Sequence, residues 1–75
     1  MRKEQKDKYR ALGLNIAYYR KARDLSQDQL AELADISRTH MSRIETAECA
    51  VSLDVVFKLC DVLEVTPTQL FDFRK

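Results

Sequence analysis

The sequence predicts a compact all-α domain, built as a five-helix repressor-like bundle. Hydrophobic residues make up 45% of the 75 residues and charged residues 33%, a balance too apolar for a disordered chain. One glycine and one proline are too few turn formers for an all-β fold. Polar capping residues precede four segments with a helical period of apolar residues. A chain of this length is expected to form a single domain over residues 1–75.

Four helix starts are marked by a capping side chain with apolar residues at the flanking positions that fix how the chain enters a helix. The caps are Ser26, Ser37, Ser52 and Thr66, with Gln29 and Gln69 completing capping boxes for the first and last of them. They divide the chain into a long first helix ending near Arg23 and helices over 26–34, 37–46, 52–63 and 67–73. We expect a core over about 9–73 and fraying of residues 1–8.

The chain has no sign of export, membrane insertion or metal binding. Its charged start passes into an amphipathic segment without an apolar run, so we expect a cytoplasmic protein with no membrane partner. Cys49 and Cys60 cannot form a disulfide framework, and with His40 they match no zinc-ligand spacing. We expect both cysteines to be small buried hydrophobes in a reducing compartment, and we expect no metal or cofactor.

An enzyme is disfavoured because the chain has a single histidine, no glycine-rich loop and too little mass to enclose a small-molecule substrate. The charge distribution is more informative. Residues 1–25 carry eight basic and three acidic residues, a net charge of +5, whereas residues 26–75 carry five basic and nine acidic residues, a net charge of −4. Such a distribution allows one basic face to hold phosphate while the other faces stay acidic.

The segment from Gln27 to Glu45 predicts a helix-turn-helix, because two helices separated by two or three residues must cross at a steep angle. Ala31 supplies the small residue where the helices touch. Asp35 lies at the corner, where the backbone needs a residue that tolerates a positive φ.

The second helix of this motif has an outward face with two guanidinium groups, short hydroxyls and no carboxylate. Because Met41 and Ile44 point inward, the helical period places four residues outward, with Thr46 at the end of the face: Arg38, Thr39, Ser42 and Arg43. A recognition helix presents such residues to base edges in the major groove, where arginine grips guanine bidentately. The alternative is an ordinary solvated polar face.

LGLNIAYYRKARDLSQDQLAELADISRTHMSRIE and SLDVVFKLCDVLEVTPTQLF resemble the Xre family, which includes the phage repressors and Cro proteins. The resemblance covers about residues 12–71 and implies a five-helix DNA-binding domain. After the third helix, where members of the family usually have a glycine, a basic residue and later a proline, this chain has Ala47, Glu48 and Val51.

The resemblance also implies roles for residues outside the recognition helix. Arg20 and Glu45 fall where the first and third helices are tied by an internal ion pair, a structural role whose alternative is a weak surface contact. Gln27, at a helix start with exposed N–H groups, is expected to contact phosphate. The other expected phosphate contacts are Ser37, Lys21 and Arg23, of which the last two serve equally well as solubilising residues. His40 is expected at the rim of the interface.

We therefore expect a sequence-specific regulator of transcription that binds double-stranded DNA, a repressor acting as a homodimer on an inverted-repeat operator. Phe71 and Phe73 are expected at the dimer interface, because a short terminal helix cannot hide them together with Leu70. We expect Leu70 and one phenylalanine to pack on the core. The alternative function is a protein–protein interaction module of the same fold that does not bind DNA.

Overall fold

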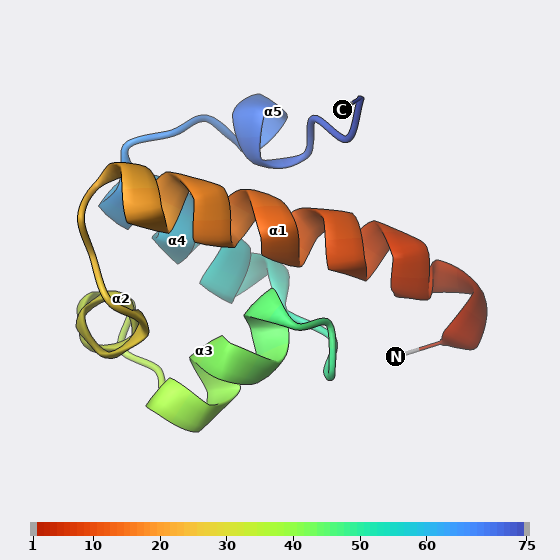
Figure 1. Ribbon diagram of the computed structural model, residues 1–75, viewed down its shortest axis with the longest axis horizontal. Helices are drawn as coiled ribbons and strands as arrows, with labels where there is room; N and C mark the ends of the chain where they lie inside the picture. Colours follow the sequence, from red (N-terminus) through yellow and green to blue (C-terminus); the bar gives the residue numbers. More distant parts are fainter. Residues whose placement is uncertain (1, 75) are drawn as a thin grey trace.

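The computed structural model describes residues 2–74 and contains only helical elements within that range (Figure 1). The elements are η1 (Lys3–Gln5), α1 (Lys6–Ala22), α2 (Gln27–Leu33), α3 (Arg38–Glu45), α4 (Leu53–Leu63) and α5 (Pro67–Leu70). The predicted all-α five-helix fold is confirmed. Within residues 2–74, no helix combines the length and apolar character needed to cross a membrane.

The four predicted helix starts are present, and each capping hydroxyl accepts a backbone N–H three residues on. These bonds join Ser26 to Gln29, Ser37 to His40, Ser52 to Val55 and Thr66 to Gln69, over 3.0–3.2 Å. In both predicted capping boxes the glutamine side chain also accepts the N–H of the cap residue. Local hydrogen bonding therefore sets where α2 to α5 begin.

The two ends of the domain differ from prediction. The expectation that residues 1–8 are frayed is wrong for Lys3 to Lys8, which are helical; Met1 lies outside the described residues. The last helix is shorter than predicted, because it ends at Leu70 instead of residue 73. Asn15, buried in α1, donates from its amide nitrogen to the carbonyls of Leu70 and Asp72, both at 2.9 Å. These bonds hold the segment after α5 against α1, and this segment is not helical.

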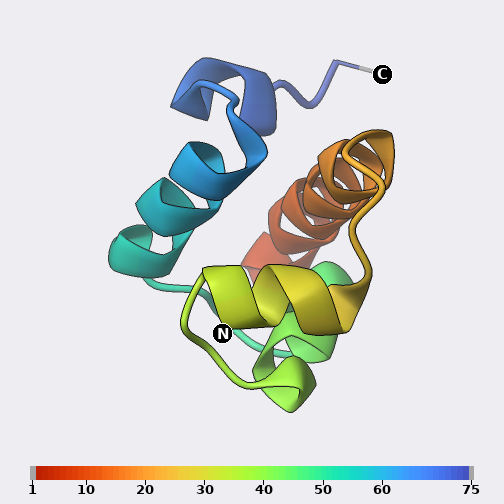
Figure 2. The same ribbon diagram turned by 90° about the vertical axis from the view of Figure 1, so that its left-hand side faces the viewer.

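Helix α1 spans the molecule, with α5 on one side of it, α2 and α3 on the other and α4 behind (Figure 1). Figure 2 shows α2 crossing beneath α1 and α4. The largest fully buried side chains come from all five α-helices and form one core: Ile16, Leu30, Met41, Val56, Leu59, Leu63 and Leu70. Helix α3 therefore packs on the same core as the other four α-helices.

Helices α2 and α3 form the predicted helix-turn-helix, with α2 seen nearly end-on in Figure 1 and α3 running across the view. Ala31 is buried where they meet, and its carbonyl accepts the N–H of Ile36 at 2.9 Å. Asp35 has the predicted positive φ, 59°. Ala47, where Xre members usually have glycine, is fully buried with a φ of 61° and so keeps the left-handed turn that glycine would supply.

Gly13, the single glycine of the chain, allows α1 to lie directly on the end of α3. A Cβ at this position would lie 2.5 Å from the carbonyl oxygen of Glu45 and 2.7 Å from that of Ile44. Both neighbours are backbone atoms, so a side chain could enter only if the helices separated. This role of Gly13 was not predicted, because it depends on backbone atoms of a distant helix.

Arg20 of α1 and Glu45 of α3 make the contact expected for an internal ion pair. Arg20 Nε lies 2.8 Å from Glu45 Oε2 and Nη2 lies 3.2 Å from Oε1, and both side chains are at least 90% buried. Arg20 Nη1 also donates to the carbonyl of Leu25 at 2.8 Å, and Gln27 Nε2 donates to Glu45 Oε1 at 2.9 Å. One network thus joins α1, α2 and α3.

Only one cysteine fits the expectation of a buried thiol. Cys60 is buried in the core, and desolvation, with a smaller contribution from Asp61, raises the pKa of its thiol above the ordinary value. The expectation is wrong for Cys49, which is half-buried with its Sγ 3.8 Å from His40 Nδ1. Cys49 lies in the loop after α3 and packs against the edge of the core.

We predict that Gly13→Ala destabilises the domain by about 3 kcal/mol, the upper end of typical overpacking costs. This loss exceeds the ~1 kcal/mol by which alanine is the better helix former. Urea unfolding measures the difference, and Leu14→Ala, at an exposed position of the same helix, serves as the control. A Gly13→Ala protein as stable as the wild type would contradict the close approach.

We predict that Glu45→Ala lowers the free energy of unfolding by roughly 3–5 kcal/mol, because it leaves the buried guanidinium of Arg20 without its counter-charge. Glu32→Ala removes an exposed carboxylate from α2 and should change stability by at most about 0.5 kcal/mol. Thermal and urea unfolding measure both. Equal losses for the two variants would show that the buried pair does not tie the helices.

Candidate nucleic-acid interface

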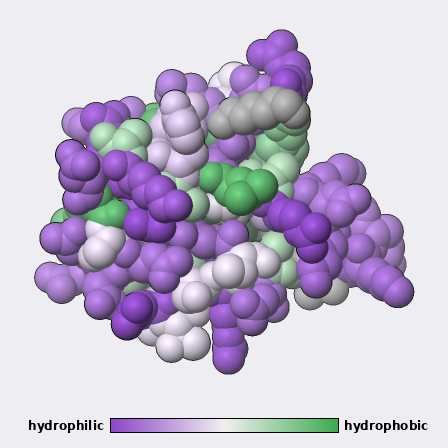
Figure 3. Space-filling model, in the orientation of Figure 1, coloured by the Kyte–Doolittle hydropathy of each residue, from purple (hydrophilic) through white to green (hydrophobic). Residues whose placement is uncertain are grey.

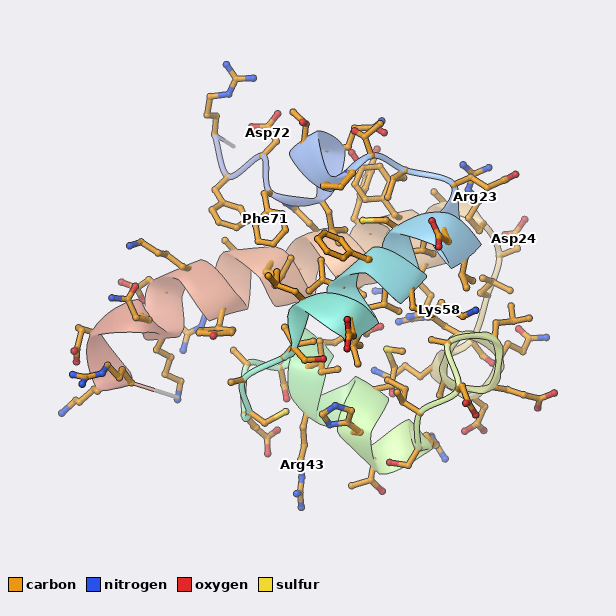
Figure 4. All side chains as sticks on the ribbon, turned by 180° about the vertical axis from the view of Figure 1, so that it is seen from behind. Arg23, Asp24, Arg43, Lys58, Phe71 and Asp72 are labelled. Carbon is orange, nitrogen blue, oxygen red and sulfur yellow. The ribbon has the colours of Figure 1, made fainter. Side chains whose placement is uncertain are left out.

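The four residues predicted to contact bases come together on the outward side of α3. Arg38, Thr39, Ser42 and Arg43 line one shallow hollow, which Gln27 of α2 and Glu48 of the following loop complete. Ser42 is half-buried, whereas the other three residues of α3 are exposed. Figure 4 shows Arg43 directed away from the bundle into solvent. The structure thus presents guanidinium groups and hydroxyls together on a single open surface.

Gln27 takes part in this surface and in the buried network behind it. It is the first residue of α2, it is half-buried, and its amide donates to Glu45. A primary amide has two N–H donors, so this bond leaves one for an acceptor outside the domain. The bond to Glu45 therefore fixes the amide beside the hollow.

Ser37 and Lys21 are both exposed, so either side chain is accessible to a phosphate outside the domain. The Ser37 hydroxyl accepts the His40 N–H as the cap of α3. It can still donate its own proton to an acceptor. Lys21 lies in the last turn of α1, which ends just before the loop leading to α2.

Arg23 is placed differently from the other expected phosphate contacts. Its guanidinium donates to the carbonyls of Leu63 at 2.9 Å and Glu64 at 3.3 Å, and it pairs with the Glu64 carboxylate at 3.3 Å. In Figure 4 Arg23 lies at the opposite side of the molecule from Arg43. This placement gives Arg23 a structural role at the end of α4 and does not support a phosphate contact.

The outward face of α3 has no carboxylate of its own, as predicted, but carboxylates of neighbouring elements lie beside it. Asp28 of α2 pairs with Arg38, with 3.2 Å between Oδ1 and Nε. Glu48 lines the hollow and accepts the Thr46 hydroxyl at 2.6 Å. The period of α3 could not reveal these groups, because both come from neighbouring elements that the fold brings to its edges.

A second surface feature is apolar and lies near the C-terminus. Phe71 and Phe73 are 40% and 38% exposed with ring centroids 6.0 Å apart, so the expectation that one of them packs on the core is wrong. Leu70 is fully buried, as expected. The rings border a hollow lined chiefly by apolar residues of α1, the loop before α4 and α4: Tyr9, Leu12, Val51, Leu53 and Val56. By contrast, the face shown in Figure 3 is mostly hydrophilic with small separate hydrophobic areas.

Comparisons with known proteins agree with this geometry. A helix-turn-helix domain family model matches residues 11–71. Control protein C.BamHI of Bacillus amyloliquefaciens is 42% identical over 50 residues, which cover 67% of this chain and 62% of that protein, less than two thirds of its length. Control protein C.SmaI of Serratia marcescens is 34% identical over 59 residues, covering 79% of this chain and 70% of that protein.

Two solved structures superpose closely on the domain. The restriction-modification controller protein C.AhdI of Aeromonas hydrophila has a TM-score of 0.81 and 32% identity, covering 84% of this chain and 96% of that one. The clp gene regulator ClgR of C. glutamicum also has a TM-score of 0.81, with coverage of 87% and 84%, and at 22% identity it supports the fold alone. The chain belongs to the Xre-type helix-turn-helix family of DNA-binding regulators.

Proposed function

We propose that this chain regulates transcription by binding double-stranded DNA sequence-specifically, with α3 in the major groove. The observation that carries the proposal is the hollow where Arg38, Thr39, Ser42 and Arg43 meet the start of α2. In a helix-turn-helix, the second helix reads base edges while the first crosses the backbone. The relatives named as control or controller proteins support a role in regulation. We further propose that the protein is a cytoplasmic repressor that acts at an operator.

Each group has a role that follows from its chemistry. Arg43 is proposed to donate to a guanine, and Thr39 and Ser42 to offer a methyl group or a hydroxyl to neighbouring bases. Gln27 and Ser37, at the starts of α2 and α3, are proposed to contact phosphate, where backbone N–H groups and the helix dipole favour an anion. Lys21 supplies a further cation beside the backbone.

We propose that the protein acts as a homodimer through the C-terminal apolar hollow. One domain reads only a few base pairs, and two-fold pairing doubles the site on an inverted repeat. Phe71 and Phe73 leave a large part of their rings exposed beside Leu53, which is 62% exposed. A second copy would cover these groups, since an isologous interface pairs the same patch on both subunits.

We predict that Arg43→Ala weakens binding to DNA selected by the wild type by about 1–3 kcal/mol and relaxes preference at one base position. Gln27→Ala should weaken selected and scrambled duplexes nearly equally and leave the salt dependence almost unchanged, because the amide carries no charge. Fluorescence anisotropy at two salt concentrations measures both. Lys58→Ala, which removes an exposed cation from α4, is the control.

An equal loss on selected and scrambled DNA would make Arg43 a phosphate contact. If the wild type binds no duplex from a random pool, the DNA-binding function fails and a protein-interaction module becomes the better description.

We predict that the protein is a dimer at micromolar concentration and that Phe71→Ala or Phe73→Ala shifts it toward monomer, because each removes apolar area from the proposed interface. Analytical ultracentrifugation measures the association. Leu33→Ala removes an exposed apolar group at 52% exposure from α2, outside the hollow, and should leave the dimer intact. A protein that stays monomeric at about 100 µM, with and without DNA, would contradict the proposal. Regulators bind their DNA sites at concentrations far below this one.

A further inference from the structure

We infer that Asp28 of α2 is a specificity-determining residue, which positions Arg38 to read a guanine and disfavours binding to phosphate alone. This inference rests on the proposed function, because it concerns how the same surface discriminates between duplexes. Asp28 does not contact a base in the proposal. It acts through the arginine and is a positioning residue.

The contact between the two side chains leaves the reading end of the arginine available. Asp28 Oδ1 lies 3.2 Å from Nε, the nitrogen nearest the aliphatic stem of Arg38. The two terminal amino groups remain able to grip guanine O6 and N7 together. A carboxylate paired with Nε therefore favours one orientation of the guanidinium without occupying its two terminal amino groups.

The pair contributes little to folding. Both side chains are largely exposed, 69% for Arg38 and 65% for Asp28, and exposed pairs are weak and screened by salt. The pair of Arg20 and Glu45, which joins α1 to α3, is by contrast buried. The exposed pair is placed instead where α3 meets the DNA in the proposed complex.

The position of Asp28 has a second consequence. It follows Gln27, the proposed phosphate contact, in the first turn of α2. On a scrambled duplex, Arg38 gains only phosphate contacts, and the nearby carboxylate repels the same phosphates. On the operator, the positioned guanidinium gains a base contact. The same carboxylate thus has opposite effects on the two complexes, which is the basis of discrimination.

The deciding variant is Asp28→Asn, compared with the wild type on selected and scrambled duplexes. Affinity for the selected DNA should fall about fivefold or more, the lower end of one bidentate contact, and guanine preference should decline at one position of each half-site. Affinity for scrambled DNA should rise. In an Arg38→Ala background, Asp28→Asn should no longer reduce binding to the selected DNA.

Two matched controls separate this role from simpler ones. Glu32→Gln removes one exposed negative charge from the same helix. Asp54→Asn removes the negative charge at the second residue of α4, the position that Asp28 occupies in α2. Both should keep the wild-type ratio of selected to scrambled affinity. Equal gains on both duplexes, or no change, for Asp28→Asn would overturn the inference while leaving the proposed function intact. Absence of duplex binding by the wild type would overturn both.

Discussion

The buried contact between Arg20 and Glu45 is the constraint on which the recognition surface depends. Glu45 is the last residue of α3, and its carboxylate accepts from α1 and from Gln27 at the start of α2. The start of α2 and the end of α3 are therefore fixed by the same anion. A buried pair of this kind adds less to stability than to orientation, because desolvation offsets much of the attraction. Its geometry defines the angle of α3 relative to α1.

Features set by near neighbours in sequence were predictable, and features set by distant contacts were not. The caps at Ser26 and Ser52 and the turn at Asp35 follow from bonds within a few residues. The extent of the last helix depends on Asn15, 55 residues before the Leu70 carbonyl that it binds. Outward residues of α3 were found from its period, whereas its acidic neighbours became visible only in three dimensions.

The proposed recognition surface, which is the hollow over α3, carries both positive and negative side chains. Arg38 and Arg43 are matched by two carboxylates, one on α2 and one in the loop after α3. A surface with strong excess positive charge binds any duplex tightly, and genome-scale competition then hides the operator. In the proposed complex, balanced charge would lower this background, and discrimination would rely on hydrogen bonds at base edges.

The turns with left-handed backbone conformations affect the unfolded chain as well as the native one. Residues 2–74 adopt positive φ at Asp24, Asp35, Ala47 and Glu64, and none of these is glycine. Each side chain makes its native turn costly, by roughly 1–2 kcal/mol for a residue such as alanine. Each also restricts the unfolded ensemble, which reduces the entropy lost on folding. Such residues have fewer accessible backbone conformations than glycine, so these connections favour one fixed placement of α3 on the bundle.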